Sequence, residues 1–99
     1  AVNDAHAQLR ETRGIEEVLH AAEAARRFDL DPGRIGDLMV LADVDTVFGT
    51  LYAPREEVAI RSHGSLHEQP VPLIAYGRGA SSFHFERNLD ALKWVVNDL

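Results

Sequence analysis

The sequence predicts a small α/β or α+β arrangement of short strands with flanking helices, and three observations carry this prediction. Residues 37–44 (DLMVLADV) hold an apolar run with the length of a strand that is covered on both faces. The alanine-rich stretch 21–28 has high helix propensity and no β-branched residue. Apolar residues recur with helical spacing between positions 86 and 99. They are Leu89, Leu92, Val95, Val96 and Leu99.

The N-terminal stretch predicts one more helix and leaves one element open. Residues 3–13 read as a short polar helix that Asn3 or Asp4 could cap and that Gly14 could end. The run 15–19 (IEEVL) is apolar at its ends and fits either a short strand or the first turn of a helix. Periodicity does not decide between the two in so short a run.

Two further strands are expected in the second half of the chain. A short run at 46–48 follows the turn signal Asp43-Val44-Asp45. Residues 71–76 (VPLIAY) read as a second buried strand, with its proline confined to the start. Turns or loops are expected at 31–33, 50–62 and 77–82.

Composition narrows the class of protein. The 99 residues suffice for a single domain, 1–99, and the net charge of −6 argues against general nucleic-acid binding, which needs surplus Lys and Arg. No apolar run reaches the length of a membrane span, so no membrane partner is expected. The chain has no cysteine, which excludes thiolate zinc sites and cysteine nucleophiles and fits the reducing cytoplasm.

The predicted strands raise a packing problem. Strands that need cover on both faces are hard to satisfy with a few short helices in a chain of 99 residues. We therefore expect some apolar faces to meet a larger body. Where that body is missing, the chain is expected to associate with itself.

One segment of the sequence contains a candidate metal ligand. His63 lies between Ser62 and Gly64 in a loop that leads into the expected strand 71–76. Neutral imidazole is the commonest metal ligand, and glycine lets backbone and ion approach closely. On spacing alone a loop histidine bonded to the backbone is the favoured interpretation. His67 lies four residues on, but Gly64 argues against the helix that would align the two rings.

The string Arg61-Ser62-His63-Gly64-Ser65, followed by Glu68-Gln69 and Val71-Pro72-Leu73, resembles the C-terminal metal-binding motif of phosphonoacetate hydrolases. These enzymes belong with the type I phosphodiesterases and nucleotide pyrophosphatases in the alkaline phosphatase superfamily. Upstream segments resemble the same region in the same order, so that the similarity runs from residue 8 to residue 77. They are residues 14–19, 23–30, 34–38 and 47–49.

The resemblance implies the C-terminal part of an alkaline phosphatase-like α/β sandwich, with 15–19 as a strand. It implies a hydrolase that uses two zinc ions to cleave a phosphonate or phosphodiester, and His63 as the last metal ligand. No residue matches the threonine or serine nucleophile or the other ligands, so the expected partners are the rest of the enzyme and a small substrate. The chain alone is expected to be inactive, because one histidine cannot hold zinc.

Two alternatives remain open at this point. The chain could be a free-standing binding or interaction module without catalysis, or a separate metal-binding module that uses His63, His67 and Glu68. For His67 itself the simpler interpretation is a solvated loop residue. Surface positions are expected for His6 and His20, and packing or capping for His84.

Overall fold

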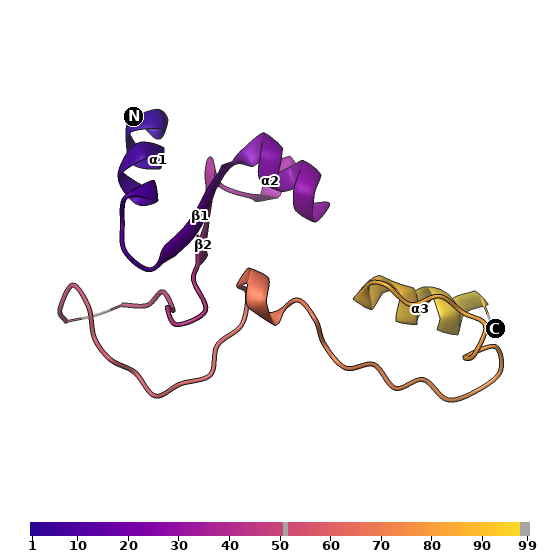
Figure 1. The fold of residues 1–99 in the computed structure, drawn as a ribbon. Coiled ribbons are helices and arrows are strands. Elements are labelled where there is room, and N and C mark those ends of the chain that lie inside the picture. The colour runs from indigo at the N-terminus through magenta and orange to yellow at the C-terminus, as the bar shows by residue number, and fades with distance from the viewer. Residues whose placement is uncertain (51, 98–99) are drawn as a thin grey trace.

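An antiparallel pair of strands with helices beside and beyond it forms the fold (Figure 1). The computed structural model describes residues 1–50 and 52–97. Within them the small mixed α/β class is confirmed. The elements are α1 (Val2–Arg10), β1 (Ile15–His20), α2 (Ala21–Phe28), the 3-10 turn η1 (Pro32–Arg34), β2 (Leu38–Ala42), the 3-10 turn η2 (Leu66–Glu68) and α3 (Asn88–Asn97).

β1 and β2 pair from Ile15 opposite Ala42 to His20 opposite Leu38, with an irregularity between Ile15 and Glu17. The open question about residues 15–19 is thus settled in favour of a strand, and the predicted helix 21–28 is confirmed as α2. The backbone N–H of Ala21 donates to the carbonyl of Asp37 at 3.0 Å, which closes the connection between the strands through α2 and η1.

The core lies where α2 packs against the strand pair. Leu19 from β1, Ala24 from α2 and Leu41 from β2 are buried and form one cluster. Ala24 is fully buried, because its small side chain lets the helix approach the sheet closely. The expected cover on both faces of β2 is only partly present: Leu41 and Ala42 are buried, and the first three residues of the strand are half-buried.

α1 lies against β1 and is shorter than predicted (Figure 1). His6 donates from Nε2 to the carbonyl of Val18 at 3.1 Å. The helix ends at Arg10, before the expected limit of 13, and no side chain caps its start. The capping role expected for Asn3 or Asp4 is therefore wrong.

The strands predicted at 46–48 and 71–76 are wrong. Neither segment is paired with β1 or β2, and the described residues between β2 and α3 hold no strand. Ile74 and Tyr76 are 96% and 98% exposed. An apolar run becomes a buried strand only where a partner strand and a covering layer exist, and neither is within reach of this segment.

α3 confirms the predicted C-terminal helix between Asn88 and Asn97; residues 98 and 99 lie outside the described part. It packs through Trp94, whose ring meets Phe85 edge-on at 5.7 Å and lies over Gly77. The predicted apolar stripe is not buried. Its described members Leu89, Leu92, Val95 and Val96 are all exposed.

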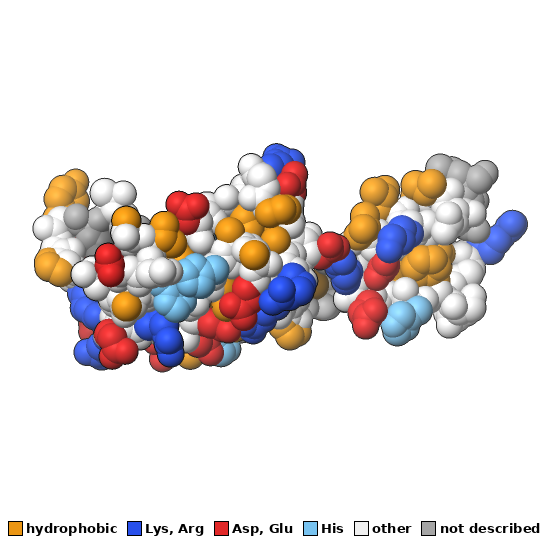
Figure 2. All heavy atoms as spheres, turned by 90° about the horizontal axis from the view of Figure 1, so that it is seen from above, with side chains coloured by type: hydrophobic (Ala, Val, Ile, Leu, Met, Phe, Trp, Pro, Cys, Tyr) orange, Lys and Arg blue, Asp and Glu red, His pale blue; other side chains and the backbone are white. Residues whose placement is uncertain are grey.

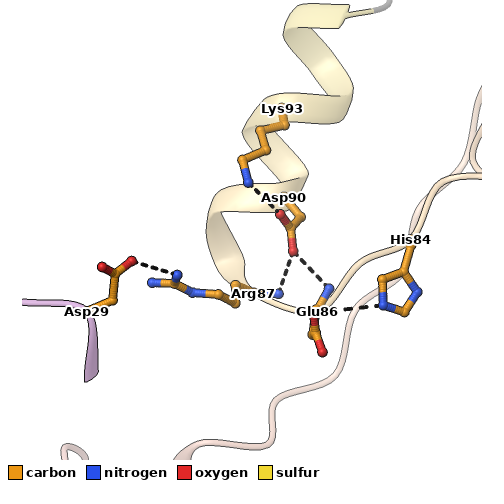
Figure 3. Close-up of polar contacts among 6 residues, drawn as sticks. All are labelled: Asp29, His84, Glu86, Arg87, Asp90 and Lys93. Atoms are coloured by element: carbon orange, nitrogen blue, oxygen red, sulfur yellow. Dashed lines mark hydrogen bonds and ion pairs between the residues drawn. The ribbon is translucent and has the colours of Figure 1, made fainter. Parts of the chain in front are cut away.

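The described chain is extended. Its radius of gyration is 18.0 Å, whereas about 13 Å is expected for a compact domain of 100 residues. The molecule narrows between the part with the sheet and the part with α3 (Figure 2). An ion pair joins the two parts: Arg87 donates to Asp29 at 2.8 Å (Figure 3). No described helix is long and apolar enough to cross a membrane.

Candidate metal-ligand histidine and its loop

His63 is exposed in the loop formed by residues 61–65, here called the His63 loop. Within the described residues its imidazole makes no hydrogen bond and no ion pair. The next residue, Gly64, has a φ of +94°, and a side chain there would meet nothing within 4 Å. His63 is therefore not hydrogen-bonded to the backbone of the described residues, which was the interpretation of this loop that spacing alone favoured. The ring nitrogens of His63 are thus open to a further partner.

The turn η2 follows the His63 loop directly and is closed by a capping box. The Ser65 hydroxyl accepts from the backbone N–H of His67 at 3.1 Å. In return the Glu68 carboxylate accepts from the backbone N–H of Ser65 at 2.8 Å, and from its hydroxyl. Such reciprocal bonds satisfy the amides that a helical turn leaves open. The turn thus has a defined shape of its own.

The hydroxyl and backbone N–H of Ser65 hold the pKa of Glu68 below its usual value, and the nearby rings of His67 and His63 add to this. Hydrogen bonds to the ionised form of a carboxyl favour that form. Glu68 is therefore a carboxylate at neutral pH and already engaged by Ser65. It gives the surroundings of His63 a negative charge.

Two side chains attach η2 to the N-terminal part of the molecule. Leu66 packs against the core cluster of Leu19, Ala24 and Leu41. His67 donates from Nε2 to the Glu16 carboxylate on β1, at 2.7 Å. His67 is exposed, as predicted, but it lies in the turn η2 and its ring has a specific partner.

Sequence reasoning missed Glu16 and Leu66. The pattern Ser-x-x-Glu at 65–68 is the sequence signal of a capping box and could have located the turn. No local signal could have found Glu16, because 51 positions separate it from His67. Such a pairing depends on how the chain folds back.

Within residues 1–50 and 52–97, no three His, Asp or Glu side chains lie together as a metal site. His67 is occupied by Glu16 and Glu68 by Ser65, so the set His63, His67 and Glu68 is not arranged around one point. Of these three side chains, only His63 has no polar partner within the described residues.

The remaining candidates have structural roles. Asp43 accepts from the backbone N–H of Asp45 at 3.1 Å, which confirms the predicted turn. His6 stacks on His20 with ring centroids 4.5 Å apart and is half-buried, so the surface position expected for His6 is wrong. His84 is exposed and lies 3.9 Å from Glu86, which replaces the packing or capping role expected for it (Figure 3).

His63 lines neither of two open hollows in the described surface. One, of about 570 Å³, is formed by residues 75–78, 80 and 81. The other, of about 460 Å³, lies between α1 and β1. No protein-family model matches the chain, and no solved structure matches it. A function for this chain must therefore be argued from its own residues.

Proposed function

We propose that the chain is the C-terminal portion of a zinc-dependent hydrolase that cleaves a phosphonate, such as a phosphonoacetate-like compound, or a phosphodiester. In this proposal His63 supplies one metal ligand. The nucleophile and the other ligands come from the rest of the enzyme, so the chain alone is inactive. With no cysteine in the chain, the cytoplasm is the compartment we propose.

The free imidazole of His63 is the observation that carries the proposal. Among the described histidines, His6 bonds to a carbonyl, His67 pairs with Glu16 and His84 lies near Glu86. His20 stacks on His6, and its ring, like that of His63, makes no hydrogen bond within the described residues. In the described part of the chain, His63 alone among these five histidines contacts neither a polar partner nor another ring. Gly64 leaves the space beside it open. This is also the histidine of the Ser-His-Gly motif, which carries the resemblance to phosphonoacetate hydrolases.

The apolar side chains downstream of His63 support a larger parent enzyme. Val71, Leu73, Ile74 and Tyr76 follow the His63 loop, and all four are exposed. Figure 2 shows that apolar side chains lie among charged ones on the surface of the molecule. The segment has the composition of a strand that is covered on both faces, but these side chains are not covered. The rest of an α/β sandwich would supply this cover.

The chemistry fits a histidine of this kind. A zinc ion bound by about four ligands would polarise the phosphoryl oxygen and lower the pKa of a bound water. The contribution of this chain is the neutral His63 ring as a nitrogen donor, presented at the surface. The Glu68 carboxylate nearby adds negative charge around that donor, which favours a cation.

A calorimetric zinc titration of this chain and of His63→Ala tests the incomplete site. Both proteins are expected to bind zinc weakly or not at all, because one imidazole does not hold the ion. Tight one-to-one binding that His63→Ala abolishes would mean that the chain builds a whole site alone. In that event the proposal fails.

The positive test uses the longer protein that the proposal requires. Its upstream sequence should carry a threonine or serine nucleophile and Asp or His ligands. There, His63→Ala should lower the zinc content and reduce hydrolysis of phosphonoacetate or a nitrophenyl phosphodiester by more than about 100-fold, since loss of even an outer-shell partner costs up to that much. His84→Ala is the matched control and should leave both unchanged. Full zinc content in His63→Ala would refute the ligand role.

The rival proposal, a free-standing interaction module, requires a closed core. The buried cluster is small, and the segment between β2 and α3 leaves large apolar side chains in water. These features favour a chain that packs against the rest of a larger protein over a free-standing module. A stable monomer with no upstream coding sequence would reverse that preference.

A further inference from the structure

We propose that His67 is a positioning residue: by pairing with Glu16 it fixes the turn η2, and with it the His63 loop, against β1. This inference takes from the proposed function only the statement that His63 is a ligand. A metal ligand must be held in place to bind well, because supporting residues set the orientation of the first-shell side chains. The docking itself depends on contacts within this chain.

Consecutive residues of η2 make the two attachments. Leu66 is partly buried and packs against the core cluster, and His67 reaches the Glu16 carboxylate on β1. The apolar contact supplies burial without direction, whereas the hydrogen bond at 2.7 Å defines an orientation. Together they hold one face of the turn against the N-terminal part of the molecule (Figure 1, the orange turn below the strands).

Docking of η2 also positions the His63 loop, because hydrogen bonds within the turn fix its shape. The capping box between Ser65 and Glu68 spans the turn and involves neither Glu16 nor the core. Ser65 is therefore fixed relative to His67. His63 lies only two residues before Ser65, so its backbone cannot move far while the turn is docked.

Other attachments of the segment 46–87 are more distant from His63 along the chain. Arg55 donates to the carbonyl of Arg13 at 2.9 Å, and Arg87 pairs with Asp29. Among the described attachments, η2 is the one next to the ligand. If it opened, the chain from position 55 to position 87 would be a long tether with His63 inside it.

The charges around His67 favour the pair. Glu16 is its partner, and the Glu68 carboxylate lies near both His67 and His63. The pair is partly exposed, so we expect a modest effect, with a change of about two- to fivefold in the population of the undocked loop when it is removed. An effect of this size is measurable by amide exchange.

The test is NMR on the metal-free chain, with amide exchange of Ser65 and His67 and the contacts of the Leu66 methyl groups to the core as readouts. In His67→Ala, exchange should rise about two- to fivefold and the Leu66 contacts should weaken. His67→Gln, which keeps an N–H donor of similar reach, should restore most of the protection. If His67→Ala acted only by removing packing at position 67, His67→Gln would not restore the protection.

Matched controls separate this pair from general effects. Glu16→Ala should loosen the turn, whereas Glu17→Ala, which removes a neighbouring pair with Arg27, should not. His84→Ala removes another exposed histidine and should change nothing. Equal exchange in His67→Ala and in the native chain would overturn the proposal, and so would a His67→Gln variant as loose as His67→Ala.

This test can fail independently of the proposed function. If the loop is docked but His63→Ala in the longer protein keeps its full zinc content, the ligand role is wrong and the docking stands. If His63 binds zinc but His67→Ala leaves the loop unchanged, the docking is wrong and the ligand role stands. If both hold, His67→Ala in the longer protein should weaken zinc binding against a chelator, and His67→Gln should recover it.

Discussion

Gly14 lies directly against the side chain of Thr46. A Cβ atom on Gly14 would be 2.8 Å from Oγ1 and 2.9 Å from Cγ2 of Thr46, and the φ of Gly14 is +92°. The carbonyl of Gly14 accepts from the backbone N–H of Asp43 at 3.0 Å. The start of β1 and the turn after β2 therefore meet at a position that only glycine fits.

Gly14→Ala should destabilise the protein by about 1–3 kcal/mol, because the new side chain meets Thr46 and the backbone conformation is unfavourable for alanine. Urea unfolding followed by far-UV circular dichroism measures the effect. The midpoint should fall with little change in slope.

Two variants separate the clash from the backbone strain. Gly64→Ala has a similar φ of +94° with nothing within 4 Å, so it carries strain alone. Thr46→Ala removes both of the closest atoms and should relieve part of the effect of Gly14→Ala. A Gly14→Ala protein as stable as the native chain would show that the turn is not packed as described.

The core cluster gives a second prediction. Leu19 is 3% exposed between α2 and β2, and Leu19→Ala should cost about 2–5 kcal/mol, the range for a large side chain lost from a core. In so small a core this loss is expected to unfold the strand pair, which would be seen as loss of slow-exchanging amides in β1 and β2. Leu92→Ala on exposed α3 is the control and should leave those amides protected.

Local patterns in the sequence were sufficient to predict α2 and β2. The alanine-rich run 21–28 predicted α2, and the apolar run 37–44 predicted β2. The same reasoning failed for 71–76, because a strand depends on a partner strand that composition does not reveal. The local pattern of residues 15–19 leaves strand and helix open, and the pairing with β2 confirms the strand that the family resemblance implied.

The candidate site could likewise be predicted only in part from the sequence. His63 could be singled out from its neighbours Ser62 and Gly64, and the Ser-x-x-Glu pattern after it encodes the turn. The partner of that turn, Glu16, lies on a different element and carries no mark of its role in the sequence. Long-range pairing of exposed charges is weakly specified, since such pairs contribute little free energy.

Asp90 gives a prediction on pH. Its carboxylate accepts from the backbone N–H of Arg87 at 2.8 Å and of Glu86 at 3.0 Å, at the start of α3 (Figure 3). These bonds, with a smaller part from Lys93, lower the pKa of Asp90 from 3.8 to about 2. Because the pKa is lower in the folded state, the stabilisation is present above pH 3.8 and is lost as the pH falls through about 2.

Trp94, the only tryptophan, reports this change, since its indole N–H donates to the carbonyl of Arg78 and its ring packs on Phe85. Its fluorescence should shift to the red as the pH falls from about 4 to about 2. Asp90→Asn keeps an acceptor but does not titrate, so this transition should be absent from it. A transition of the same size in Asp90→Asn would assign the effect to another carboxyl group.

The last prediction concerns the exposed apolar segment. Ile74 and Tyr76 are almost fully in water, and each large apolar side chain that becomes buried gains about 1.5–3 kcal/mol. The isolated chain of 11.0 kDa should therefore associate, with a light-scattering mass that rises above the monomer as the concentration increases. The double variant Ile74→Ser, Tyr76→Ser should shift this rise to higher concentration, whereas Val2→Ser on α1 should not. A monomeric mass at every concentration would mean that these side chains need no cover, and it would remove one of the two supports for a larger parent enzyme.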